Sequence, residues 1–145
     1  MFIGEYTHNL DTKNRISLPF KFRKDLGRKV IITPGLENCL FIFNVKEWSK
    51  VRETLSGGPG LSFLSSDQRS FNRFLFGRAA EAEVDKVGRI LIPDFLKDRA
   101  GLKDEAVFVG VEDRVEIWNK NMWQEYRTRV EKQADELAEK IAKGK

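Results

Sequence analysis

The stretch DTKNRISLP at residues 11–19 is matched much later in the chain by DKVGRILIP at residues 85–93. Each stretch has an Asp four residues before an Arg, then an apolar run, then a proline. An offset of 74 residues superposes them as follows: Asp11 on Asp85, Arg15 on Arg89, Ile16 on Ile90, and Pro19 on Pro93. Agreement in both residue type and spacing indicates an internal repeat, and a repeat constrains the fold of the whole chain.

The repeat extends beyond these two stretches. After one inserted residue the offset becomes 75, and GLENCLFIF at 35–43 lies over GVEDRVEIW at 110–118. Trp48 then lies over Trp123. We therefore interpret the chain as a tandem duplication of a unit of about fifty residues.

The composition is that of a soluble globular protein. The 145 residues are 41% hydrophobic and include 11 Phe and 3 Trp, which is enough for a core. No run approaches the roughly 18 apolar residues that a membrane span needs, and the first residues lack the pattern of a secretory signal peptide. A single cysteine, Cys39, excludes an internal disulfide and suits a reducing cytoplasm, where we expect the protein.

The net charge of +4 is concentrated at the start of the chain. Residues 1–30 hold seven Lys or Arg and three Asp or Glu, so the remainder sums to zero. A local basic excess is typical of surfaces that bind polyanions such as nucleic acid. Charge alone slightly favours the other interpretation, a solvated basic face.

Each unit predicts the same order of elements. A strand precedes the repeated turn, a second strand follows it, and a short helix begins at the proline and ends at a glycine. Two more strands joined by a turn, and then a helix, complete the unit. In the first unit we expect strands at 4–10, 15–18, 29–35 and 39–43 and a short helix at 20–27. In the second we expect strands at 80–84, 89–92, 106–110 and 114–118 and a short helix at 94–101.

Between the units, GGPG at 57–60 predicts a linker. A helix is then expected at 66–76, capped by Ser65 or Ser66 and ended by Gly77. Its buried side is expected to consist of Phe71, Phe74 and Leu75. Because four short strands are too few to close a core alone, we expect the two units to combine into one structure. The predicted fold is α+β, mainly β: a pseudo-two-fold barrel with peripheral helices.

The last segment predicts a long helix at 119–142, capped by Asn119. Its apolar residues recur at helical spacing: Trp123, Tyr126, Val130, Ala134, Leu137 and Ile141. The simplest interpretation is that the front of this helix packs on its own barrel. Beyond residue 130 the apolar seam is thin, so that part either reaches a neighbouring subunit or frays.

The repeated turn is rigidly specified. Asp11 and Asp85 can accept hydrogen bonds from amides further along the turn. The fourth position is Asn14 in one copy and Gly88 in the other, and both residue types tolerate a positive φ. We therefore expect these residues to have structural roles in the turn.

Cations flank both turns: Lys13 and Arg15 in the first copy, and Lys86 and Arg89 in the second. Arginine suits phosphates and guanine edges because its planar fork donates two parallel hydrogen bonds. The alternative is that each arginine only pairs with the aspartate of its own turn. The motif itself does not separate these interpretations, whereas the basic surroundings and the repetition favour binding.

Arg15 ranks first among the candidate contacts because Arg23 and Lys24 follow it in the basic segment. Arg89 lies in the neutral part of the chain and is followed by Asp94 and Asp98. The second turn is therefore either a DNA contact, a structural turn or part of a subunit interface.

Signals for catalysis are weak. A duplicated Asp can form the shared dyad of an aspartic protease, but neither copy has the Asp-Thr-Gly sequence of that chemistry. His8 is the only histidine, so neither a histidine-based triad nor a multi-histidine metal site is available. Cys39 is interpreted as a turn or strand residue. We expect no enzyme, no catalytic residue, no metal and no cofactor.

The quoted segments resemble the MraZ family, whose two halves are each related to the SpoVT/AbrB-type DNA-binding domain. The similarity rests on FIGEYTHNLDTKNRISLPFKFR, EAEVDKVGRILIPDFL and GVEDRVEIW, and it covers residues 1 to about 127. Asn14 departs from the glycine that the family usually has. The resemblance implies AbrB-like repeats at 5–47 and 78–120, a helical linker at 48–77 and a C-terminal helix at 121–145. It also implies a barrel of the swapped-hairpin or double-psi type.

The resemblance further implies a bacterial regulator of transcription located at the nucleoid. Members bind short G-rich direct repeats in double-stranded DNA upstream of the division and cell-wall gene cluster that contains their own gene. They usually repress it, and they assemble into ring-like homo-oligomers. The implied contacts are the motif arginines, Arg15 and Arg89, together with basic residues at or near the turns: Lys13, Lys86, Arg23 and Lys24. The competing interpretation is a scaffolding oligomer whose basic patch is incidental.

Overall fold

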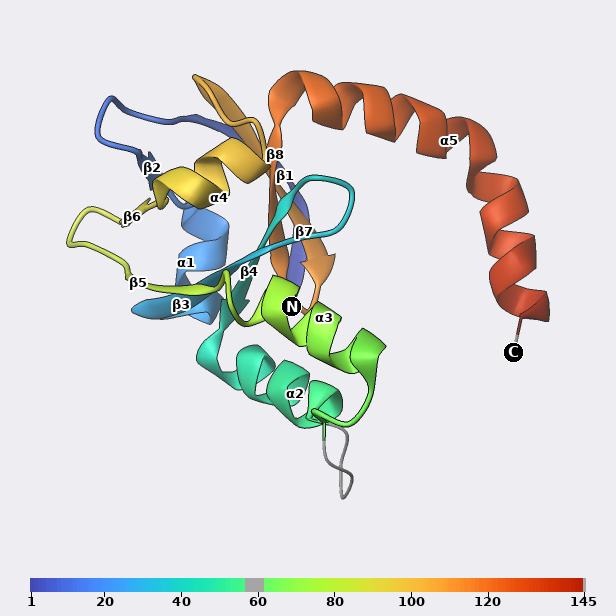
Figure 1. The fold of residues 1–145 in the computed structure, drawn as a ribbon. Coiled ribbons are helices and arrows are strands. Elements are labelled where there is room, and N and C mark those ends of the chain that lie inside the picture. Colours follow the sequence, from blue (N-terminus) through green and yellow to red (C-terminus); the bar gives the residue numbers. More distant parts are fainter. Residues whose placement is uncertain (57–61, 145) are drawn as a thin grey trace.

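The computed structural model describes residues 1–56 and 62–144 (Figure 1). The first half forms β1 (Phe2–Asn9), β2 (Arg15–Ser17), α1 (Phe20–Leu26), β3 (Lys29–Pro34), β4 (Leu40–Asn44) and α2 (Val45–Leu55), followed by α3 (Ser66–Leu75). The second half forms β5 (Ala80–Glu83), β6 (Arg89–Leu91), α4 (Asp94–Arg99), β7 (Glu105–Glu112), β8 (Val115–Asn119) and α5 (Lys120–Lys143). The same order of strands and short helix occurs twice, as the repeat predicts, and the fold is α+β with mainly sheet. The predicted linker at 57–60 lies outside the described residues.

Strands of the two halves are interleaved in one antiparallel sheet of six strands, in the order β1-β7-β8-β4-β3-β5. β1 pairs with β7, and its counterpart β5 pairs with β3. β4 pairs with β8 at the centre, and β2 and β6 form a separate two-stranded ribbon. Each half therefore supplies strands that complete the sheet of the other, which agrees with the expectation that the halves depend on each other.

The six-stranded sheet is open. β1 and β5 are its edge strands, and within the described residues they are not paired with each other. These pairings do not close a barrel, so the pseudo-two-fold barrel stays a prediction.

The short helices α1 and α4 begin directly after the prolines of the repeated stretches. The helices start at Phe20 and Asp94, as predicted, and Pro19 and Pro93 are the N-cap residues, one position before the first helical position that the sequence assigned to them. Their φ values of −54° and −58° are those that the proline ring imposes, and this ring directs the chain from the ribbon into the helix. Gly27 and Gly101 follow the helices with the expected positive φ, 79° and 61°.

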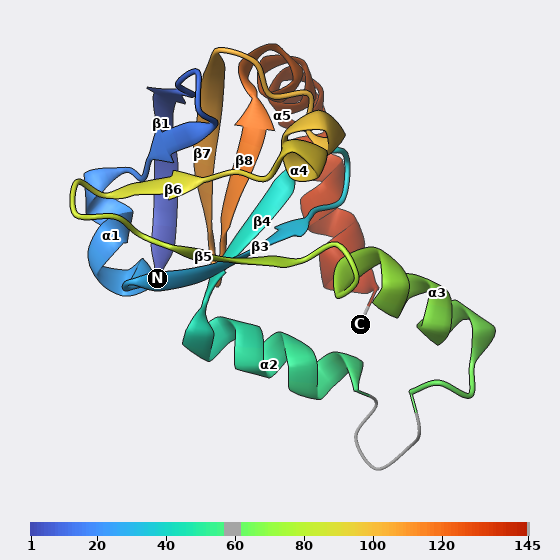
Figure 2. The same ribbon diagram turned by 60° about the vertical axis from the view of Figure 1, so that its left-hand side comes forward.

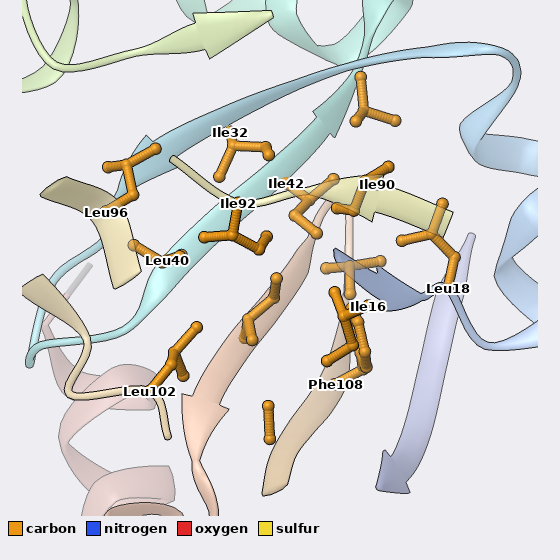
Figure 3. Close-up of a cluster of buried hydrophobic side chains, with 14 of the residues drawn as sticks. Ile16, Leu18, Ile32, Leu40, Ile42, Ile90, Ile92, Leu96, Leu102 and Phe108 are labelled. Atoms are coloured by element: carbon orange, nitrogen blue, oxygen red, sulfur yellow. The ribbon is translucent and has the colours of Figure 1, made fainter. Parts of the chain in front are cut away.

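The main hydrophobic core lies between the ribbon and one face of the six-stranded sheet (Figures 2 and 3). Ile16 and Ile90 are direct partners across the ribbon, and each is 1% exposed. Both pack in the same cluster as Ile42 and Phe108 on the sheet. Because this core takes side chains from both halves, one half alone would leave much of its apolar surface in water.

A second, smaller cluster lies on the other face of the sheet and contains Val107, Val109 and Trp118. The first turns of α5 cover it. The Trp118 ring lies 5.2 Å from the Trp123 ring and 4.9 Å from the Tyr126 ring, measured between centroids. Asn119 caps α5 by accepting a hydrogen bond from the Met122 amide. The front of α5 therefore packs on its own sheet, as predicted.

The remainder of α5 projects away from the body (Figure 1). Residues 131 to 144 are all exposed, and the Leu137 and Ile141 side chains are 37% and 67% exposed. Although α5 is long, neither it nor any other helix in the described ranges is apolar enough to cross a membrane.

α3 begins as predicted, because the Ser65 hydroxyl accepts a hydrogen bond from the Gln68 amide. Leu75 is buried and Phe74 is partly buried. The prediction that Phe71 is buried is wrong, since its side chain is 37% exposed. The reason is position along the helix: α3 meets β3 and its end is buried at Leu75, whereas Phe71 lies one turn earlier, with its ring tilted against the Phe74 ring at 5.9 Å between centroids.

Replacing a core residue of the ribbon should unfold both halves together. We expect Ile90→Ala to lower the free energy of unfolding by about 2–5 kcal/mol, because it leaves a cavity between ribbon and sheet. The exposed neighbour Leu91 is the control, and Leu91→Ala should cost no more than about 0.5 kcal/mol. Urea denaturation followed by circular dichroism and tryptophan fluorescence measures both. Two separate transitions, of which Ile90→Ala shifts only one, would contradict interdependent halves.

Candidate nucleic-acid interface

The first turn, residues 11–14, is organised by the Asp11 carboxylate. Its Oδ1 accepts hydrogen bonds from the backbone amides of Lys13 and Arg15, both at 2.9 Å. Its Oδ2 accepts one from the Arg15 Nε, also at 2.9 Å. The backbone amide of Asn14 closes the turn on the Asp11 carbonyl at 3.1 Å. One side chain therefore fixes both the path of the turn and the direction of its arginine.

The second turn, residues 85–88, repeats this geometry. The Asp85 Oδ1 accepts hydrogen bonds from the amides of Val87 and Arg89 at 3.0 and 2.8 Å, and its Oδ2 accepts one from the Arg89 Nε at 2.8 Å. Both motif arginines have side chains that are 34% exposed. The local geometry therefore gives no preference between Arg15 and Arg89.

The fourth position of each turn has the predicted positive φ. The value is 61° at Asn14 and 85° at Gly88. An asparagine at this position is consistent with the conformation, because its side chain tolerates the left-handed region better than most.

The ribbon places both arginines on one face. Arg15 is opposite Leu91 and Arg89 is opposite Ser17, while Ile16 and Ile90 between them point into the core. Because side chains alternate along a strand, the two arginines share the face that points away from the core. The strands are antiparallel, so the two turns lie at opposite ends of the ribbon (Figure 2).

Each guanidinium is held at one nitrogen and free at the others. Within the described ranges, the terminal nitrogens of Arg15 and Arg89 make no hydrogen bond; only Nε is engaged, by the aspartate. The arginines do pair within the turn, but the pairing leaves the two terminal nitrogens of each guanidinium, with four N–H donors, unengaged by the described residues. A fork oriented this way can donate to a phosphate or to the edge of a guanine.

Arg23 contacts the turn of the other half. Its Nε donates to the Leu18 carbonyl at 2.9 Å, and its guanidinium lies over Gly88, where any Cβ would collide with it. α1 of the first half therefore holds the turn of the second half. Lys13, Lys24 and Lys86 are exposed and form no ion pair in the parts of the chain that the structure describes.

A matching contact holds the first turn. Asn14 donates from its side-chain nitrogen to Asp94 and accepts at its side-chain oxygen from Lys97 Nζ at 3.1 Å. Both partners belong to α4 of the second half. Sequence reasoning missed Asp94 and Lys97 as partners of this turn. The repeat contains the signal, because the offset of 74 superposes Lys97 on Arg23.

The turn hydrogen bonds stabilise the charged form of each aspartate. The amide of Arg15 is the largest factor that lowers the pKa of Asp11 below its ordinary value, and the amide of Arg89 does the same for the pKa of Asp85. His8 lies on β1, and its ring packs edge-on against Phe108. Partial burial, and then the charge of Arg23, lower the pKa of His8.

Cys39 and the possible metal ligands are the remaining reactive groups in the described residues. Cys39 is buried, and burial raises the pKa of its thiol, which keeps the group protonated and unreactive. No group of three or more His, Cys, Asp or Glu side chains in the described ranges could hold a metal ion.

Comparison with known proteins identifies relatives over nearly the whole chain. Residues 1–74 and 75–143 each match the family described as MraZ protein, antitoxin-like. The chain is 47% identical over 142 residues to the transcriptional regulator MraZ of Acetivibrio thermocellus. This alignment covers 98% of this chain and 97% of that protein. It is 43% identical over 141 residues to the protein of the same name from Caldanaerobacter subterraneus subsp. tengcongensis, with coverage of 97% and 96%. The corresponding protein of Desulforamulus reducens is 47% identical over 141 residues, with coverage of 97% of each chain.

The turn aspartates should make stability depend on acid pH. Because the pKa of Asp85 is lowered in the folded state, its stabilisation is present above its ordinary pKa and is lost as the pH falls through the lowered value. We expect Asp85→Asn to be less stable than wild type near neutral pH and to lose less stability between about pH 5 and about pH 3. Urea titrations at several pH values measure this. Asp135→Asn, on the exposed end of α5, is the control, and an Asp85→Asn profile parallel to wild type would contradict the role of the carboxylate.

Gly88 should be less replaceable than Gly101, although both have a positive φ. Strain from that φ should cost each alanine variant about 1–2 kcal/mol. A Cβ at Gly101 would meet only an ordinary contact with the Met122 sulfur at 3.7 Å, whereas Gly88→Ala must also displace the Arg23 guanidinium, which we expect to add about 1 kcal/mol or more. Chemical denaturation of the two variants compares them. Equal losses would mean that Arg23 does not hold the second turn.

Proposed function

We propose, because this chain belongs to the MraZ family, that it regulates transcription by binding double-stranded DNA. The observation that carries the proposal is the ribbon, which presents Arg15 and Arg89 on one face with each guanidinium oriented by an aspartate and free at its terminal nitrogens. The relatives are named transcriptional regulators, which supports a regulatory and non-enzymatic role.

The shape of this surface suits the major groove. A two-stranded antiparallel ribbon fits the width of the major groove of B-DNA, and side chains on its outer face then reach the base edges. Arginine is the side chain that most often reads guanine, through the two acceptors that guanine presents there. These properties support G-rich DNA as the target.

The proposed contacts divide into two kinds. Arg15 and Arg89 read base edges, while Lys13, Lys86 and Lys24 neutralise phosphates. Arg23 is engaged with Leu18 and Gly88, so its main contribution is to hold the second turn, and its remaining nitrogens are available to a phosphate.

The finer features of the function rest on the family resemblance. We infer that the target is the promoter of the division and cell-wall gene cluster that contains the protein's own gene, that binding usually represses it, and that the protein acts at the nucleoid in the cytoplasm. A ring-like homo-oligomer would present many copies of the ribbon to successive direct repeats. Each further contact then raises the avidity without new chemistry.

The finer description of the fold is also a proposal. The exchange of strands between halves supports a swapped-hairpin barrel with repeats at 5–47 and 78–120, joined by the helical linker at 48–77 and followed by the C-terminal helix at 121–145.

A second candidate function is a scaffolding oligomer. The observation that favours it is the exposed end of α5, which projects from the body of the protein and carries the exposed apolar residues Leu137 and Ile141. In that case the basic face of the ribbon would bind DNA without sequence preference.

The proposed function is tested by fluorescence anisotropy with the DNA upstream of the protein's own gene and a scrambled duplex. We expect tighter binding to the upstream DNA, a steep fall of affinity with salt, and a further fall when direct repeats are removed. Arg15→Ala should weaken discrimination between the duplexes by about 1–3 kcal/mol if it reads a base. Arg52→Ala, on α2 away from the ribbon, is the matched control. Equal affinity for both duplexes would leave only the scaffolding oligomer.

A further inference from the structure

A groove lies beside the second turn, between the loop that follows α1 and the end of β5. It has a volume of about 570 Å³ and is lined by residues 27–29 and 83–86. The amide of Val84 donates to the carbonyl of Arg28 at 2.8 Å, which ties the two walls together. The groove is therefore a fixed part of the fold, and it begins where the turn that presents Arg89 begins.

The groove carries a net positive charge. It is lined by three cations, Arg28, Lys29 and Lys86, and by two carboxylates, Glu83 and Asp85. Asp85 is already satisfied by the turn, and Lys29 pairs with Glu81 at 3.0 Å. Within the described part of the chain, the exposed side chains of Arg28 and Lys86 have no ion-pair partner.

The corresponding groove at the first turn is less basic. It has a volume of about 330 Å³ and is lined by two cations, Lys97 and Lys103, and by two carboxylates, Asp11 and Asp104. Lys97 already donates to Asn14. The repeat superposes Leu102 on Arg28 and Thr12 on Lys86, so this groove lacks both of the free cations.

The interleaving of the halves produces this difference. The basic segment at 1–30 lies next to the first turn in sequence, but its α1 and the loop after it pack beside the second turn. Arg23 over Gly88 adds a further cation there, whereas Asp94 adds a carboxylate beside Asn14.

We propose that the groove at residues 27–29 and 83–86 receives the phosphate backbone of DNA, with Arg28 and Lys86 as its ligands, so that the second turn is the stronger of the two DNA contacts. This proposal rests on the proposed function, and it reverses the order expected from the sequence, in which Arg15 ranked first. An exposed, unpaired arginine and lysine beside an oriented motif arginine give one base-reading group flanked by two phosphate ligands.

The test is fluorescence anisotropy with the upstream and the scrambled duplex over a series of salt concentrations. Arg28→Ala should weaken binding to both duplexes, because a phosphate contact is lost. For the same reason, the slope of log affinity against log salt concentration should become less steep by about one for each bound chain. Lys103→Ala, in the corresponding groove, and Arg52→Ala, on α2, should change the slope less. Arg89→Ala should weaken binding more than Arg15→Ala does. Thermal unfolding should be unchanged for Arg28→Ala, because the side chain is exposed.

The outcomes separate the two proposals. A wild-type slope for Arg28→Ala, an equal loss for Lys103→Ala, or a larger loss for Arg15→Ala than for Arg89→Ala would overturn the assignment of this groove, even if wild type still prefers the upstream duplex. Equal wild-type affinity for both duplexes would overturn the proposed function, while a reduced slope for Arg28→Ala would still support the phosphate contact.

Discussion

The pairing of β2 with β6, sealed by Ile16 against Ile90, is the contact on which the rest of the structure depends. The two strands come from different halves of the chain, and their inner side chains complete the main core. Their outer side chains include both motif arginines. Successive side chains of a strand point to opposite faces of the sheet. Burial of the two isoleucines therefore places their neighbours Arg15 and Arg89 on the outer face of the ribbon.

The same interleaving builds each turn from both halves. α1 supplies Arg23, which lies over Gly88, and α4 supplies Asp94 and Lys97, which hold Asn14. The two sets of contacts differ in chemistry but have the same role. Each holds the turn residue with positive φ, Asn14 or Gly88, so that the aspartate of that turn can orient its arginine. A substitution in one half is therefore expected to alter the turn of the other half, so the duplication couples the two turns as well as repeating them.

Much of this architecture can be predicted from the sequence, because the repeat aligns Asp, Arg and Pro at matching positions and the elements follow from local pattern. The positive φ at Asn14 and Gly88 follows from residue type alone. What the sequence does not show is which helix lies beside which turn, since that depends on strand exchange between segments about seventy residues apart. The sequence therefore gives Arg23 only as a candidate DNA contact, and it predicts a buried Phe71 because helical spacing does not reveal where α3 leaves the sheet. The hydrogen bonds of the Asn14 side chain, by contrast, become visible only with Asp94 and Lys97 beside it.

The most direct test of the central claim, that one ribbon face reads DNA through two aspartate-oriented arginines, is protection of guanine N7 from methylation on the bound upstream duplex. Guanine N7 lies in the major groove, where an arginine fork would cover it. We expect wild type to protect two separate groups of guanines, Arg89→Ala to lose one group and Arg15→Ala to lose the other. Protection that is absent, or that neither substitution changes, would mean that the ribbon does not enter the major groove.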